Sequence, residues 1–132
     1  ALPICENLGN DIVVPIPGPS AIIAAFSAFG VMGNEFGFLG FVPHKKGRET
    51  FFNTLGSYSF PVGFYESKHR LIKTLDSLFE RFQETHILCI AREITKKFEE
   101  YKKGSISEIR EYIQTSPHSQ KGEFVLILVP RE

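Results

Sequence analysis

The chain of 132 residues and 14.9 kDa has room for one domain, or at most two very small ones. Hydrophobic residues make up 42% and charged residues 23%, which excludes a disordered chain, a collagen-like repeat and a coiled coil. Lysine and arginine together number 15, as do aspartate and glutamate, so any binding of nucleic acid must come from local patches.

The first third of the chain predicts an apolar helix with one strand before it and one strand after it. The strands are expected at 12–16 and 36–42, where each apolar run ends at a proline. The helix is expected at 21–29, with Ser20 as its N-cap and Gly30 at its end. It is apolar on nearly all sides and therefore needs cover from a partner or a further domain. Prolines and glycine interrupt the uncharged stretch around it, so this stretch does not span a membrane.

The rest of the chain alternates between helices and strands. Apolar residues at helical spacing predict helices at 47–55 and 71–82, and a third helix that Ser105 or Ser107 caps. Strands are expected at these positions: 60–65, 86–91, 98–103 and 124–129. The buried run 86–91 contains Cys89, which we interpret as a small hydrophobic residue. Strands that alternate with helices predict an α/β fold.

Polar clusters follow three of the expected strands directly, at 44–48, 66–70 and 92–97. Ligands of open α/β sheets bind beyond the carboxyl ends of parallel strands. If these strands are parallel, the three clusters lie on one edge; a strand that runs the other way moves its cluster to the opposite edge. The alternative is that the basic runs are solvated loop ends.

Two further features are candidates for chemistry. The turn at 17–20 precedes a helix and could accept an anion, although it lacks the spacing of a phosphate-binding motif. Glu66 and Glu93 each follow an apolar strand, where a desolvated carboxylate can act as a base or can pair with Arg70 or Arg92. No cluster of cysteines and histidines has metal-ligand spacing, so no metal is expected.

Five motifs in chain order carry a resemblance to a known family. They are VPIPGPSA at 14–21, GFVPHKKGR at 40–48, FYESKHR at 64–70, AREITKKFEE at 91–100 and KGEF at 121–124. In this order they resemble the tetrapyrrole methylase family of S-adenosylmethionine-dependent enzymes, and within it the members that modify ribosomal RNA. The resemblance extends from Ile12 to the end of the chain. Lys68 departs from the pattern, because the family usually has proline there.

The resemblance implies a two-domain α/β protein with the cofactor in the cleft between the domains. The glycine-rich loop and the Gly-Thr-Pro stretch of the family's N-terminal domain do not occur in this sequence. We therefore expect a piece of a longer protein, with residues 1–11 as a remnant of the N-terminal domain or linker. Residues 12–132 are then the C-terminal domain, with a mixed five-stranded sheet flanked by helices.

The implied reaction is methyl transfer from S-adenosylmethionine to the 2′-hydroxyl of a cytidine in small-subunit ribosomal RNA, in the cytoplasm. We expect Glu66 or Glu93 to orient or deprotonate the acceptor. The matching positions imply these cofactor contacts: Ser20, Ala21, Tyr65, Glu66, Ile94 and Thr95. The basic clusters predict these RNA contacts: His44, Lys45, Lys46, Arg48, Lys68, His69, Arg70, Arg92, Lys96 and Lys97.

The expected partners are the missing N-terminal domain, the ribosomal RNA and a second copy of the chain. No contact with a membrane is expected. Two alternatives remain open. The chain is a non-catalytic module that binds RNA or dimerises through the apolar helix 21–29, or it belongs to an enzyme that methylates a small molecule such as a tetrapyrrole. The basic clusters favour RNA over a small molecule.

Overall fold

The computed structural model describes residues 17–31 and 33–131; the strand expected at 12–16, the boundary expected at residue 11 and Cys5 lie outside them. The expected α/β fold with a mixed five-stranded sheet is confirmed. The elements, in chain order, are α2 (Ala21–Phe29), β1 (Gly37–Phe41), α3 (Arg48–Gly56), β2 (Val62–Ser67), α4 (Leu71–Phe82), β3 (His86–Arg92), β4 (Glu100–Ser105), α5 (Ile106–Thr115), the short 3₁₀ helix Pro117–Gln120 and β5 (Glu123–Pro130).

The order of strands in the sheet is β1-β2-β5-β3-β4. Strand β1 pairs with β2 in parallel, whereas β5 pairs antiparallel with both β2 and β3, and β4 pairs antiparallel with β3. Strands β1, β2 and β3 therefore all run in the same direction. The three polar clusters that follow them lie at the same edge of the sheet, as expected for parallel strands.

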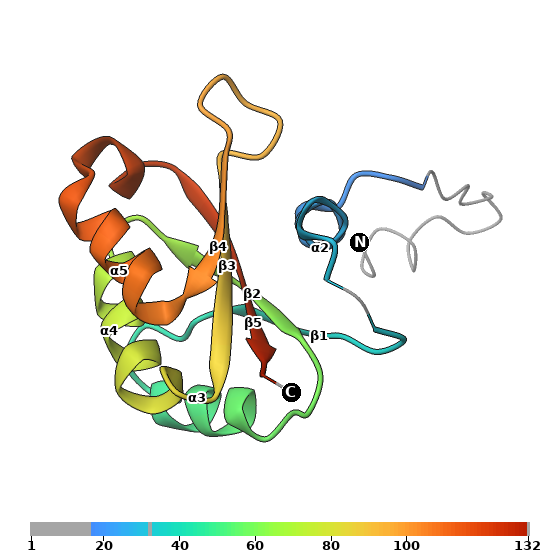
Figure 1. The fold of residues 1–132 in the computed structure, drawn as a ribbon, viewed down its shortest axis with the longest axis vertical. Helices are drawn as coiled ribbons and strands as arrows, with labels where there is room; N and C mark the ends of the chain where they lie inside the picture. Colours follow the sequence, from blue (N-terminus) through green and yellow to red (C-terminus); the bar gives the residue numbers. More distant parts are fainter. Residues whose placement is uncertain (1–16, 32, 132) are drawn as a thin grey trace, which may run out of the picture.

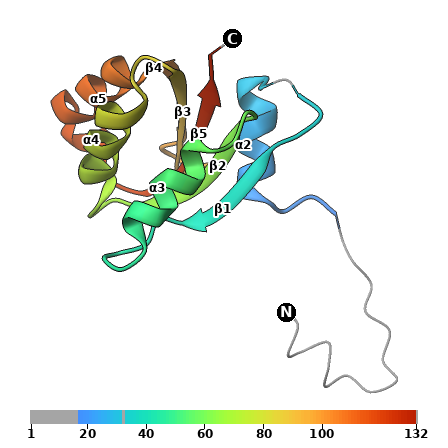
Figure 2. The ribbon, with the colours of Figure 1, turned by 90° about the horizontal axis from the view of Figure 1, so that it is seen from below.

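Helices cover the two faces of the sheet unequally. Helices α3, α4 and α5 lie on one side and α2 alone lies on the other (Figure 1), and the same arrangement is visible from below (Figure 2). Since neighbouring residues of a strand point to opposite faces, β5 contributes Phe124 and Leu126 to the three-helix side and Val125 and Ile127 to the α2 side. The sheet is buried on both faces at its centre.

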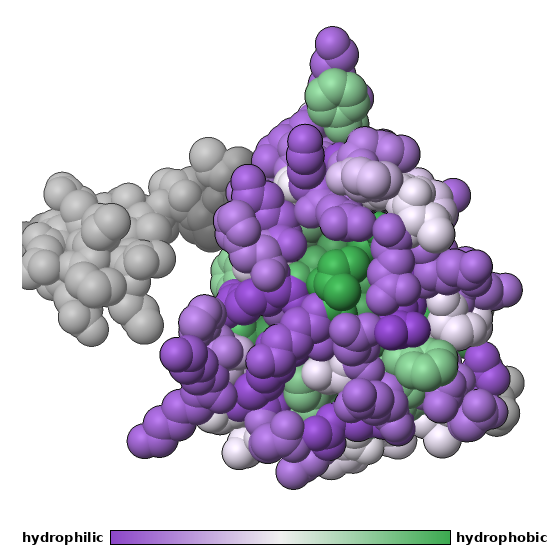
Figure 3. All heavy atoms as spheres, turned by 90° about the vertical axis from the view of Figure 1, so that its left-hand side faces the viewer, coloured by the Kyte–Doolittle hydropathy of each residue, from purple (hydrophilic) through white to green (hydrophobic). Residues whose placement is uncertain are grey.

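The three-helix side contains the larger core. Helix α4 buries Leu71, Leu75, Leu78 and Phe82, which recur at helical spacing. The side chains that point outward from this half of the molecule are mostly hydrophilic (Figure 3). Helix α5 begins at a capping box, in which Ser105 is the cap and exchanges hydrogen bonds with the helix's third residue.

Helix α2 lies unusually close to the sheet because of a glycine in β2. A Cβ at Gly63 would lie 2.1 Å from Cδ1 of Ile22, so a larger residue would push the helix away. The helix buries Ile22 and Ala25, while Ile23 is 45% exposed. The described residues thus cover α2 on one side, and the expected contact with a second copy stays a prediction.

Two further sequence predictions concern burial. Cys89 is fully buried in β3, as expected, and burial raises the pKa of its thiol to about 11. It is therefore protonated at neutral pH and packs as a small hydrophobic side chain. Among the described residues, no helix is long and apolar enough to cross a membrane.

Candidate functional site

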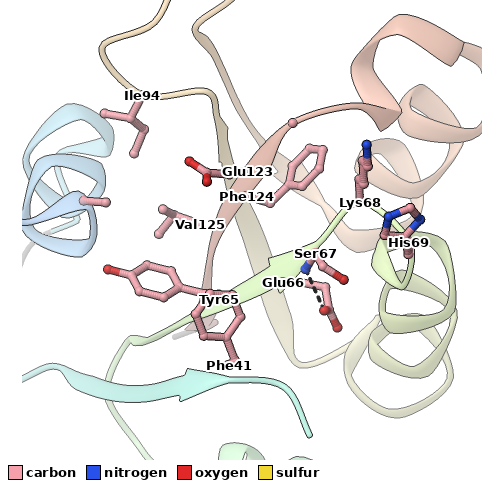
Figure 4. A pocket seen from close by; sticks show the side chains of 12 residues that line it. Phe41, Tyr65, Glu66, Ser67, Lys68, His69, Ile94, Glu123, Phe124 and Val125 are labelled. Carbon is pink, nitrogen blue, oxygen red and sulfur yellow. Dashed lines mark hydrogen bonds between the residues drawn. The ribbon is translucent and has the colours of Figure 1, made fainter. Parts of the chain in front are cut away.

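A cavity of about 640 Å³ opens at the edge of the sheet where the parallel strands end. Tyr65 and Val125 form its floor on the α2 side of the sheet, Phe41 stands at the end of β1, and Ile94 lies on the side toward α2 (Figure 4). Ala21, the first residue of α2, completes the lining on that side. Five separate segments of the chain thus meet around one mostly apolar space.

Most polar residues of the cavity lie around two strand ends. Ser67 is the last residue of β2 and is followed by Lys68 and His69, whereas Gly122 precedes Glu123, the first residue of β5. Because β5 runs against β2, its first residues arrive at the edge where β2 ends. The lining therefore carries both a cation and a carboxylate next to an apolar floor, a combination typical of small-molecule sites.

Tyr65 and Glu66 are neighbours in β2 and point to opposite faces of the sheet. Tyr65 points into the cavity, whereas the carboxylate of Glu66 turns away from it (Figure 4). Glu66 is 1% exposed and lies on the three-helix side. Strand β2 continues to Ser67, two residues beyond the expected end at Tyr65. Glu66 is therefore part of the strand, and the alternation of side chains turns it to the buried face.

The carboxylate of Glu66 is held by donors on both oxygens. Oε1 accepts hydrogen bonds from the backbone N–H of Ser67 at 2.7 Å and from Nε of Arg70 at 3.0 Å. Oε2 accepts the hydroxyl of Thr74 at 2.6 Å, and Nη1 of Arg48 lies 3.9 Å away. This geometry favours the ion-pair alternative for Glu66 over a role as a base.

Arg48 belongs to the same buried network. Its Nη2 donates to Oγ1 of Thr74 at 2.9 Å, and its guanidinium lies over the ring of Phe52. Burial lowers the pKa of Arg48, while the charge of Glu66 acts in the opposite direction. The side chain is 8% exposed, so the prediction that Arg48 contacts RNA is wrong: α3 turns it inward toward Glu66.

Glu93 fastens the loop after β3 to the start of β5. Its Oε1 accepts the backbone N–H of Glu123 at 2.8 Å and Nζ of Lys96 at 3.2 Å, and Lys96 also pairs with Glu123 at 2.8 Å. The backbone hydrogen bond, followed by that from Lys96, lowers the pKa of Glu93. A lowered pKa makes a carboxylate a weaker base, which again favours the ion-pair alternative.

The backbone of this loop is strained where it approaches the cavity. Glu93 and Thr95 have φ angles of 52° and 65°, in the left-handed region that favours glycine. Gly122 makes room for the loop, since a Cβ there would lie 2.6 Å from Cγ of Glu93. The hydrogen bonds of Glu93 thus hold Ile94, between the two strained residues, against the cavity.

The cavity brings together four of the six residues expected to contact a cofactor, namely Ala21, Tyr65, Glu66 and Ile94. Ser20 and Thr95 are the chain neighbours of two of them and do not line the cavity. The site residues that sequence reasoning missed are Phe41, Ser67, Gly122, Glu123, Phe124 and Val125. The KGEF motif at 121–124 was a signal for three of these, because a motif between loop and strand marks a strand end.

The expected RNA contacts separate into exposed and buried groups. Those exposed are His44, Lys45, Lys46, Lys68, His69, Lys96 and Lys97. Arg92 is 9% exposed and pairs with Glu100 on the three-helix side, so the prediction that it contacts RNA is wrong. Arg70 and Lys96 are each already paired with a carboxylate. The described residues contain no group of three or more potential metal ligands.

The Glu66 network predicts a large loss of stability on substitution. Glu66→Gln leaves Arg48 and Arg70 without a balancing charge in a buried place, which costs about 3–5 kcal/mol. Urea unfolding of the chain at neutral pH measures it. The control is Glu80→Gln on the exposed side of α4, where a change of less than about 0.5 kcal/mol is expected. Equal midpoints for the two variants contradict the structural role of Glu66.

The Glu93 contacts predict a pH dependence of stability. Because the pKa of Glu93 is lowered in the folded chain, its contribution is complete above its unfolded pKa of about 4.3 and is lost as the pH falls through the folded pKa. Glu93→Gln should therefore lose less stability than the unsubstituted chain between pH 7 and pH 3. Urea unfolding across this range tests it, with Glu80→Gln as control. A Glu93→Gln profile parallel to that of the unsubstituted chain rules the coupling out.

Comparisons with known proteins identify the family of this chain. The family model for Tetrapyrrole (Corrin/Porphyrin) Methylases matches residues 2–110. The ribosomal RNA small subunit methyltransferase I of Neisseria meningitidis serogroup A / serotype 4A is 41% identical over 121 residues, which cover 91% of this chain and 41% of that protein. Its namesake from Haemophilus influenzae is 37% identical over 125 residues, which cover 94% and 44% of the two chains. The chain thus spans less than half the length of these relatives.

Two solved structures share the fold. The methyltransferase CobJ superposes with a TM-score of 0.64 at 21% identity, over 96% of this chain and 54% of that one. The cobalamin biosynthetic enzyme CbiF, a cobalt precorrin-4 methyltransferase, gives a TM-score of 0.67 at 13% identity, over 96% and 55%. With the family model matching most of the chain, the resemblance carried by the five motifs is confirmed: this chain belongs to the tetrapyrrole methylase family.

Proposed function

We propose that the chain is the C-terminal part of an S-adenosylmethionine-dependent methyltransferase that modifies the 2′-hydroxyl of a cytidine in small-subunit ribosomal RNA. The observation that carries the proposal is the cavity at the ends of three parallel strands, with exposed lysines and histidines on the same edge. The relatives named as ribosomal RNA small subunit methyltransferase I support the substrate class. The longer protein, with its N-terminal domain, is the proposed enzyme.

The residues of the cavity fit the proposed cofactor. A volume of about 640 Å³ lies within the usual range for small-molecule sites, roughly 300–1,000 Å³. Tyr65, Ile94 and Val125 offer an apolar wall for the adenine ring. S-adenosylmethionine supplies a methyl group on a positively charged sulfur, which makes the methyl an activated electrophile. The N-terminal domain is proposed to close the open side of the cavity.

The part that this chain plays in the reaction is mainly binding and orientation. Since the leaving group is already activated, catalysis depends first on alignment of the acceptor hydroxyl with the methyl group. The carboxylate of Glu66 is fully engaged, and the lowered pKa of Glu93 makes it a weak base. We therefore propose that both shape the site, and that the acceptor's proton leaves by another group.

The exposed basic side chains at this edge of the sheet are the proposed contacts to RNA. Phosphate contacts need positive charge without a set sequence, and His44, Lys45 and Lys46 form an exposed run after β1, with Lys68 and His69 beside it after β2. The net charge of the chain is zero, so this local gathering of cations is what favours RNA. We expect the protein to work in the cytoplasm and to pair with a second copy of itself.

The function is tested with the full-length protein, radiolabelled S-adenosylmethionine and small ribosomal subunits that lack the modification. Label recovered as 2′-O-methylcytidine after digestion of the RNA to nucleosides supports the proposal. Label on a tetrapyrrole but not on RNA supports the small-molecule alternative instead. RNA binding without transfer to any acceptor supports the non-catalytic alternative.

The cavity predicts that a larger residue at Ala21 obstructs the cofactor. Ala21 is exposed and lines the cavity at the first turn of α2, so Ala21→Leu fills space that the cofactor needs without disturbing the core. Overpacking of this kind costs about 1–3 kcal/mol, and the affinity for S-adenosylmethionine should fall about 10-fold or more. Titration calorimetry on the full-length protein measures it.

The matched control is Ala28→Leu, an exposed position of the same helix that does not line the cavity. It should bind S-adenosylmethionine as the unsubstituted protein does. If Ala21→Leu binds with the same affinity as Ala28→Leu, the cofactor lies elsewhere.

The basic edge predicts a change in the salt dependence of RNA binding. Replacing Lys45 and Lys46 by glutamine removes two phosphate contacts, so the slope of log affinity against log salt should fall by roughly 0.7 for each lysine. Lys73→Gln, on an exposed position of α4, is the control and should leave the slope unchanged. Filter binding at several salt concentrations gives the slopes. Equal slopes for all proteins exclude these lysines as phosphate contacts.

A further inference from the structure

Phe41 is a large apolar side chain that the fold leaves uncovered. It is 64% exposed, although it stands at the rim of the cavity and at the end of a strand. Its ring centroid lies 5.2 Å from that of Tyr65, whose ring also packs against Phe38 at 4.9 Å. Figure 4 shows Phe41 beside Tyr65 on the cavity. The ring of Tyr65 inside the cavity is thus in contact with the exposed ring of Phe41 at the cavity's opening.

A bulge in β1 is what brings Phe41 to this position. Phe38 pairs with Gly63 and Phe41 pairs with Tyr65, so three steps along β1 correspond to two along β2. The extra residue is accommodated at Gly40, whose φ of 68° is readily reached by glycine. In a regular strand Phe38 and Phe41 would point to opposite faces; the bulge places both on the face of Tyr65. Phe41 therefore does not point to the three-helix side, where a large apolar side chain could be buried.

The surroundings of Phe41 are cationic. His44, Lys45 and Lys46 follow it after two intervening residues and are exposed, and Lys68 lines the same cavity. Within residues 17–31 and 33–131, none of these lysines forms an ion pair with a carboxylate. A purely apolar partner on Phe41 would desolvate the neighbouring ammonium groups without compensation. A partner with a flat apolar ring and negative charges next to it satisfies both features.

We propose that Phe41 stacks on an unpaired base of the RNA substrate while Lys45, Lys46 and Lys68 bind the phosphates of adjacent nucleotides. This inference rests on the proposed RNA methyltransferase function and adds the state of the substrate, a single-stranded segment. Aromatic side chains recognise bases that are free of a helix, because only those expose their faces. The bulge at Gly40 is the device that aims the aromatic ring at the base.

The first test uses fluorescence of the full-length protein. This chain contains no tryptophan, so Phe41→Trp adds a reporter whose signal is the difference from the unsubstituted protein. A short single-stranded RNA should quench this signal, whereas a duplex of the same sequence and S-adenosylmethionine alone should not. Phe36→Trp is the control: Phe36 is 49% exposed, does not line this cavity and lies outside the basic clusters, so its signal should stay unchanged.

The second test measures affinity for the same single-stranded RNA. Phe41→Ala should weaken binding about 10-fold to 100-fold, the usual range for loss of one stacked base, with the salt slope unchanged. Phe41→Tyr keeps a flat ring and should restore most of the affinity. Phe36→Ala, outside the basic clusters, should bind as the unsubstituted protein does.

Several results overturn the inference. Quenching of Phe41→Trp by S-adenosylmethionine alone assigns the ring to the cofactor, and equal quenching by duplex RNA removes the need for an unpaired base. A tryptophan at this position that is already shielded in the unliganded full-length protein assigns Phe41 to a contact between domains. If Phe41→Ala binds RNA normally while the enzyme still methylates it, this inference fails and the proposed function stands. If the unsubstituted protein neither binds nor methylates RNA, both fail.

Discussion

The insertion of β5 between β2 and β3 decides where the chemistry of this chain gathers. Because β5 pairs antiparallel with both neighbours, β2 and β3 must run in the same direction, and β1 follows β2 in parallel. Three loops that are far apart in the sequence therefore emerge at one edge. The start of β5 reaches the same edge from the opposite direction and supplies Glu123, which ties the loop after β3 in place. The cavity is a product of this strand order.

Alternation along the strands then divides each polar motif between two tasks. In β2, Tyr65 faces the cavity and Glu66 faces the core, where it holds Arg70, Thr74 and Arg48 together. A motif that contains both residues resembles a single functional unit in the sequence. In three dimensions one half of it shapes the cavity, and the other half fixes α3 and α4 against the sheet from which the cavity is built.

The sequence correctly predicts those helices and strands whose residue patterns are local. The period of apolar residues in α4, and the uninterrupted apolar runs of β3 and β5, predict their structure without reference to the rest of the chain. The end of β2 was missed by two residues, and with it the burial of Glu66. The fate of Arg48 depends on Thr74, which is 26 positions away, and no local pattern contains that contact. The bulge at Gly40 also needs a partner strand before it exists.

One further rule would have improved the prediction for the basic clusters. Their cations separate by residue type: Arg48, Arg70 and Arg92 pair with carboxylates in buried or half-buried places, whereas Lys45, Lys46 and Lys68 remain exposed. A guanidinium is planar and weakly hydrated, so it loses less on burial than an ammonium group and can serve several acceptors at once. Arg48 and Arg70 thus pair with Glu66, and Arg92 pairs with Glu100, on the three-helix side of the sheet. A chain whose formal charges cancel can still present positive charge at one edge, because Lys45, Lys46 and Lys68 gather there and form no ion pair within the described residues.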